Sequence, residues 1–152
     1  MRYSTKLSDA AHILVLIALN PYDELTSQQI ARSIATNPGF VRQIMSMLRK
    51  SGLIVSITGH AKPALSRPAS EISLLDIYRA VEGDKPLLHL DIDTNPDCGV
   101  GIGIQSALKD YYAEIQELAE QRMKHITLQN IVDTYKNKAG IDDISTLINI
   151  WI

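Results

Sequence analysis

Apolar residues recur with helical spacing over most of the chain. Between Ser8 and Leu19 they fall on every side of a helix, and the run stops at Asn20-Pro21, where proline cannot continue a helix because it lacks an N–H group. Further capped starts at Ser73 and Thr127 predict a helix that ends at Gly83 and a last helix near the C-terminus. The pattern predicts a mainly α fold around a buried first helix.

Two short helices joined by a tight turn are predicted next. Thr26-Ser-Gln-Gln29 matches a capping box that starts a helix ending near Ile34, and Asn37 can cap a second helix whose first position is Pro38. The second helix has an apolar face and a polar, cationic one, which is typical of a helix-turn-helix. The apolar positions are Val41, Ile44, Met45 and Leu48; the polar ones are Arg42, Gln43, Ser46 and Arg49.

A β-hairpin and a long helix follow. The β-branched run 53–58 predicts a strand that pairs with residues 64–67 across 59–63, forming a small wing. Residues 84–103, rich in Gly, Pro and Asp, are predicted to be irregular, and the glycines at 99, 101 and 103 are interpreted as a flexible joint. From about Gly103 apolar residues alternate by four and three, close to a coiled-coil seam. The seam consists of Ile104, Leu108, Tyr111, Ile115 and Leu118.

This seam needs a partner surface. A second copy of the chain is the simplest one, and packing within the same chain is the alternative. The seam residues are therefore candidate dimer-interface residues. The apolar C-terminal segment 141–152 is expected to dock onto the body of the protein.

Charge is divided unevenly along the 152 residues. The net charge of −2 combines +5 in residues 1–70, with eight Lys and Arg against three acids, and −7 in residues 71–152. The first part can therefore face a polyanion while the second avoids it. A single cysteine, Cys98, favours a reducing compartment, and no apolar run is long enough to span a membrane, so we expect a cytoplasmic protein.

The order of elements and three sequence segments resemble the bacterial Rrf family of winged-helix transcription regulators. The segments are Ser4-Thr5-Lys6, residues 42–53, and most specifically residues 66–83 (SRPASEISLLDIYRAVEG). The resemblance implies a dimeric repressor that binds a two-fold-related operator in double-stranded DNA. It also implies three parts: a winged helix-turn-helix in residues 1–83, an effector-type loop in 84–103, and a dimerisation helix with a helical tail in 104–152.

On this interpretation residues 37–43 enter the major groove, where Arg42 and Gln43 reach base edges and Asn37 engages phosphate. Members of the family often carry Glu where this chain has Arg42, so a changed operator sequence is expected. The wing lacks the arginine and the Gly-Gly pair that relatives often carry. The full set of DNA-binding candidates is Thr26, Asn37, Pro38, Gly39, Phe40, Arg42, Gln43, Arg49, Lys50, His60, Lys62 and Arg67.

Cys98 is the candidate sensor residue, with an inert thiol packed under the loop as the alternative. One cysteine cannot supply the three thiolates of the family's iron–sulfur cluster, so no cofactor is expected. His89-Leu-Asp-Ile-Asp93 has a spacing that can bind a metal by accident, and no metal site is predicted from it. The four histidines show no catalytic arrangement, so no enzyme is expected. The alternative function is a winged-helix module that binds protein instead of DNA.

Overall fold

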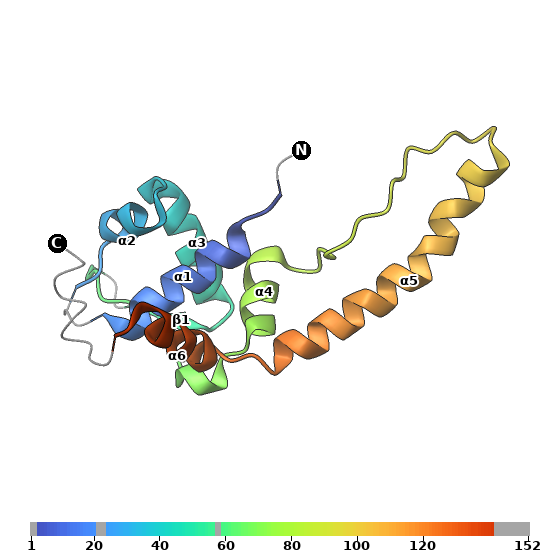
Figure 1. Ribbon diagram of the computed structural model, residues 1–152. Coiled ribbons are helices and arrows are strands. Elements are labelled where there is room, and N and C mark those ends of the chain that lie inside the picture. The colour runs from blue at the N-terminus through green and yellow to red at the C-terminus, as the bar shows by residue number, and fades with distance from the viewer. Residues whose placement is uncertain (1–2, 21–23, 57–58, 142–152) are drawn as a thin grey trace.

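The computed structural model describes residues 3–20, 24–56 and 59–141 (Figure 1). Within that part of the chain, helices predominate and a two-stranded antiparallel sheet forms the hairpin, which confirms the mainly α prediction. The elements are α1 Lys6–Leu19, α2 Ser27–Ile34, α3 Pro38–Lys50, β1 Ile54–Val55, β2 Ala64–Leu65, the 3-10 helix η1 Ala69–Glu71, α4 Leu74–Glu82, α5 Gly99–Lys124 and α6 Leu128–Ala139.

Helix α1 lies at the centre of the core and contacts α2, α3, α4, α6 and β2. Ala10, Ile13 and Leu14 are completely buried, as the apolar residues on every side of this helix predict. Among the described residues, no polar or charged side chain is buried. The core is therefore held by apolar packing, in which each fully buried Leu or Ile contributes about 1.5–3 kcal/mol.

The predicted helix starts are confirmed. The side chains of Thr26, Ser73 and Thr127 each accept a hydrogen bond from the backbone N–H three residues later, and the side chain at that later position bonds back in all three cases. Asn37 caps α3 with Pro38 at the first position, and Gly83 ends α4. Local capping chemistry therefore determines where these helices begin.

Helix α5 begins at Gly99, so the predicted irregular segment ends earlier than residue 103 and the interpretation of the three glycines as a flexible joint is wrong. Cys98 is the N-cap residue, without a side-chain capping bond. Gly101 is needed inside the first turns because a Cβ there would lie 2.7 Å from the carbonyl oxygen of Asn95. The close approach of the 95–98 turn to the helix was not visible in the helical spacing.

The hairpin is shorter than predicted. Ile54 pairs with Leu65 and Val55 with Ala64, and residues 57–58 of the predicted strand lie outside the described residues. A two-residue pairing is weak by itself. The hairpin therefore depends on contacts with the helices around it.

The chain after α5 returns to the core formed by the first helices. Leu128, Val132 and Ile141 lie in the same apolar cluster as Ile13. A backbone bridge joins Ser73 to Thr127, with Leu74 N–H donating to Ile126 O and Leu128 N–H donating to Ile72 O, both at 2.7 Å. Ile141 is thus the one described residue of the C-terminal segment 141–152 expected to dock, and residues 142–152 lie outside the described part.

Helix α5 extends away from this body (Figure 1). Only its last part contacts α4, and Met123 is its one buried residue. In the described residues, no helix is both long and apolar enough to cross a membrane.

The turn between α2 and α3 suggests a test of stability. Ala35 has φ 59°, a left-handed conformation that costs a residue with a Cβ about 1–2 kcal/mol. Ala35→Gly should therefore raise the free energy of unfolding by about 1 kcal/mol. The same change at Ala113, exposed in the middle of α5, should lower it by about 1 kcal/mol because glycine is a poor helix former.

Thermal denaturation followed by circular dichroism measures both variants. A shift of the two midpoints in the same direction would contradict the assigned strain at Ala35.

Candidate nucleic-acid interface

Helices α2 and α3 pack against each other and are joined by three residues, 35–37. Ala35 ends α2, and the N–H of Thr36 donates to the carbonyl of Ala31 at 2.9 Å. The left-handed Ala35 reverses the chain, and Asn37 then caps α3, whose first residue is Pro38. This confirms the helix–turn–helix arrangement predicted from the caps.

The start of α3 keeps polar groups available to a ligand. The side-chain oxygen of Asn37 accepts from Phe40 N–H at 2.8 Å, which leaves the amide NH₂ of this exposed residue as a donor. Gly39 is exposed, and a Cβ there would lie 3.1 Å from the Asn37 oxygen. Since the N–H groups of a first helical turn favour anions, this end of α3 suits a phosphate.

The outward face of α3 presents Arg42, Gln43, Arg49 and Lys50 to solvent. The inward face is buried through Val41, Ile44, Met45 and Leu48. Phe40 is half-buried against the core, and Thr26 is used in its capping box, so these two predicted candidates support the helices instead of lying free. The available side chains are therefore Arg42, Gln43 and the two cations at the helix end.

The wing is attached to the helix-turn-helix at both sides. The N–H of Leu25, just before α2, donates to the carbonyl of Ala61 in the hairpin loop at 2.7 Å. Arg49 Nε donates to Ser56 Oγ at 2.9 Å and so joins the end of α3 to the residue after β1. His60 and Lys62 are exposed in the hairpin loop. The wing and the outward face of α3 therefore belong to one connected surface.

Arg67 makes contacts within the protein. Its Nη2 lies 3.1 Å from Asp76 Oδ2, and its Nε donates to the carbonyl of Glu71 at 2.9 Å. Asp76 also accepts from Ser73 N–H at 2.9 Å in the capping box of α4. Two N–H groups of Arg67 are thus engaged within the protein and fasten the chain after β2 to α4, and its contact with a phosphate stays a prediction.

The charge of this surface has one sign. Between Ser27 and Arg67 the sequence contains no Asp or Glu, whereas it contains six Lys and Arg. Arg32 is one of these six cations and is exposed on α2. It is missing from the predicted DNA-binding residues because the spacing of apolar residues in α3 says nothing about α2. The absence of acids from the whole segment is the sequence feature that points to it.

The predicted seam of α5 is exposed to solvent in the single chain. Tyr111 is 66% exposed, Ile115 48% and Leu118 61%, Ile104 is also exposed, and Leu108 is half-buried. The segment before α5 runs along the helix and is held by side chains of the helix: Leu87 N–H donates to Gln116 Oε1 at 2.8 Å, and Asp91 N–H to Gln105 Oε1 at 3.1 Å. This segment therefore lies beside α5 and leaves the seam uncovered.

Cys98 is exposed at the start of α5, so the alternative of a thiol packed under the loop is wrong. His89, Asp91 and Asp93 do not converge: among the described residues, no three His, Cys, Asp or Glu side chains are grouped as metal ligands.

The comparisons with known proteins agree with this geometry. A family model named Rrf2 and described as "Iron-dependent Transcriptional regulator" matches residues 3–134. The chain is 35% identical over 131 residues to YwnA of Bacillus subtilis, whose name describes an HTH-type transcriptional regulator; the match covers 86% of this chain and 96% of YwnA. The family and this relative are transcriptional regulators and not enzymes, as predicted.

Two solved structures are similar in fold. One, described as a DNA binding protein, has a TM-score of 0.66 and 32% identity, covering 83% of this chain and 97% of its own. The other is CymR, the global cysteine regulator of Bacillus subtilis, with a TM-score of 0.64 and 22% identity, covering 88% and 97%. The predicted winged-helix fold is confirmed.

The iron in the family description does not fit the donor set of this chain. The single cysteine cannot hold an iron–sulfur cluster through three thiolates, and the described residues offer no cluster of other ligands. An iron–sulfur cluster held by three thiolates of one chain is therefore excluded.

The position of Asp76 generates a test. Asp76→Ala should lower the free energy of unfolding by about 1–2 kcal/mol, chiefly through the lost capping box, because the pair with Arg67 is partly exposed and adds little. Asp133→Ala is the matched control, since Asp133 is exposed and bonds to Gln129 on the same helix. Urea denaturation measures both variants, and equal losses would argue against a special role for Asp76.

Proposed function

Because the chain belongs to the Rrf2 family of transcriptional regulators, we propose that it is a homodimeric repressor that binds a two-fold-related operator in double-stranded DNA. The observation that carries the proposal is the surface of α2, α3 and the wing, which bears exposed cations and is built from a segment without a single acid. Neutralising phosphates with such a surface releases counterions and supplies most of the affinity for DNA.

In this proposal α3 reads the sequence. Arg42 and Gln43 lie one to two turns from the start of the helix, the part that contacts base edges when a recognition helix enters the major groove. Arginine prefers O6 and N7 of guanine, and glutamine suits N6 and N7 of adenine. Asn37 donates to a phosphate, and the exposed Arg49, Lys50, His60 and Lys62 add contacts to the backbone without reading bases.

Dimerisation is proposed through α5. Its exposed seam is apolar over several turns. The same seam of a second copy can cover it, so the interface uses one surface on both subunits. Two subunits joined in this way would hold their α3 helices about 34 Å apart, one turn of DNA, and so favour a two-fold-related site. A regulator of this kind works in the cytoplasm, beside the DNA, and a redox or electrophile response at the exposed Cys98 stays a prediction.

The division between reading and positioning can be measured. Arg42→Ala should relax the preference at one base pair and cost about 1–3 kcal/mol on the preferred operator. Lys62→Ala should weaken binding to all sequences alike and reduce the slope of log affinity against log salt by about 1. Mobility-shift titrations at several salt concentrations, on operators selected by sequencing the DNA that the protein retains, give both quantities.

Lys124→Ala, at the end of α5, is the control for the loss of one positive charge. Identical effects of Arg42→Ala and Lys62→Ala would contradict the assignment. Binding without a steep dependence on salt would favour the alternative of a protein-binding module.

The role of α5 can be tested separately. Ile115→Glu should convert the dimer to a monomer, because it places a charge in the centre of the seam, where it would be buried without a partner. Ala113→Glu, on the opposite side of the helix, should leave the dimer intact. Sedimentation equilibrium measures both, and a wild-type protein that is monomeric at micromolar concentration would refute the proposal.

A further inference from the structure

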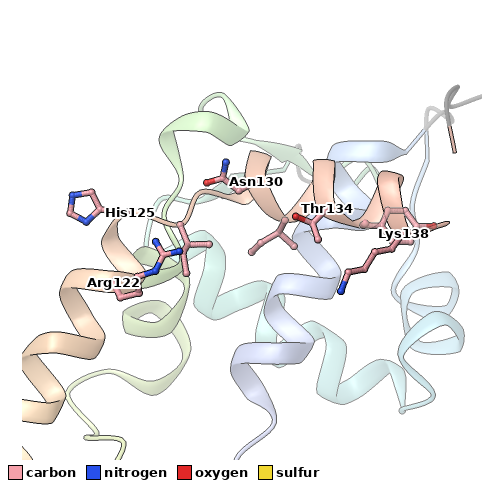
Figure 2. Close-up of a pocket in the computed structure, with 8 residues that line it drawn as sticks. Arg122, His125, Asn130, Thr134 and Lys138 are labelled. Atoms are coloured by element: carbon pink, nitrogen blue, oxygen red, sulfur yellow. The ribbon is translucent and has the colours of Figure 1, made fainter. Parts of the chain in front are cut away.

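An open groove of about 650 Å³ lies at the junction of α5 and α6 (Figure 2). Its apolar part is formed by Ile126, Ile131 and Tyr135, and cationic or basic side chains border it. Arg122 and His125 lie at the α5 end, and Lys138 lies near the far end of α6. None of its lining residues belongs to α2, α3 or the hairpin, so this groove is distinct from the proposed DNA-binding surface.

The charge of the groove is not neutralised from within. None of its eight lining residues is acidic, and within residues 3–20, 24–56 and 59–141 no carboxylate pairs with Arg122 or Lys138. The nearest acid on α6 by sequence, Asp133, is engaged by Gln129 and does not line the groove. Nδ1 of His125 lies 2.7 Å from the carbonyl oxygen of Gln121, which leaves Nε2 for another partner. Unpaired cations around an apolar surface complement an amphipathic anion.

The volume of this open groove falls within the range of about 300–1,000 Å³ of small-molecule sites, and its lining combines apolar side chains with a few polar groups, as theirs does. A guanidinium binds a carboxylate through two parallel N–H groups, and the Ile and Tyr side chains suit a hydrocarbon or aromatic body. Inorganic anions would gain nothing from the apolar part. The chemistry therefore favours an organic carboxylate with an apolar body.

The floor of the groove is joined to the base of the wing. Ile126, which lines it, accepts through its carbonyl from Leu74 N–H at 2.7 Å, and Thr127 is bridged to Ser73. Ser73 starts α4 in a capping box with Asp76, and Asp76 holds Arg67 after β2. A ligand that moves the 126–128 segment would therefore shift the residues that fasten the wing.

We propose that this groove binds a small organic carboxylate with an apolar body and that its occupancy changes the affinity of the protein for DNA. The binding site stands on the groove itself, and the effect on DNA rests on the proposed function. The signal of the regulator would then be a metabolite of this class, sensed at α5 and α6 and transmitted to the wing through the paired 72–74 and 126–128 segments.

Calorimetric titration of the full-length protein with 4-phenylbutyrate tests the site, with 4-phenylbutanamide as the neutral analogue and inorganic phosphate as the anion without an apolar body. Saturable binding of the carboxylate alone is expected. The double variant Arg122→Gln/Lys138→Gln should bind it at least about tenfold more weakly, because charge-assisted hydrogen bonds are lost. The matched control Lys109→Gln/Lys124→Gln removes two exposed lysines of α5 that do not line the groove and should bind as the wild type does.

Several results would overturn the site: no saturation at millimolar carboxylate, equal binding of the amide, or an equal loss in the control variant. A change of oligomeric state in the Arg122/Lys138 variant, seen by sedimentation, would instead identify the groove as a subunit contact and also overturn it. Thermal denaturation checks that both double variants are folded.

Mobility-shift titrations with and without 4-phenylbutyrate separate this inference from the proposed function. A ligand-dependent change of DNA affinity in the wild type that is lost in the Arg122/Lys138 variant supports the regulatory role. DNA binding that ignores a bound carboxylate overturns that role and leaves the proposed function intact. Carboxylate binding without any DNA binding would refute the proposed function and keep the site.

Discussion

The burial of α1 is the interaction on which the rest of this structure depends. Its apolar residues point in all directions, so other helices must surround it, and α2, α3, α4 and α6 do so. Because α3 places Val41, Ile44 and Leu48 against this core, Arg42 and Gln43 on its other side must face solvent. A hydrophobic requirement at the centre thus determines which polar side chains reach a ligand at the surface.

The wing depends on the helices more than on its own strands. Two paired residues on each strand provide little stability, so contacts with the helices hold the hairpin in place. Leu25 bonds to the hairpin loop, Arg49 bonds to the residue after β1, and Arg67, after β2, pairs with Asp76. The last of these contacts is made with α4, whose start is bridged to the α5–α6 junction. The position of the wing is consequently linked to the α5–α6 junction, which lies outside the proposed DNA-binding surface.

The apolar periodicity of α5 predicts the helix and its exposed face, but not the residue at which the helix begins. The alternation from Ile104 to Leu118 predicted a long helix with one apolar face, and that face is exposed in the single chain. The apolar alternation begins only near Gly103, whereas the helix begins at Gly99. The turn formed by residues 95–98 packs closely against Gly101, and this contact between neighbouring segments explains why glycine stands inside the helix.

The sequence by itself determined the helices and their caps, the polar face of α3 and the unequal division of charge, because capping and amphipathic spacing involve residues only a few positions apart. Only the tertiary structure decided that Arg67 binds Asp76, that Phe40 supports the core, and that Ile126 and Tyr135 form a groove with Arg122 and Lys138. Each of these contacts joins different elements or depends on how they pack. Their partners are selected by the packing of helices around α1, which local spacing does not encode.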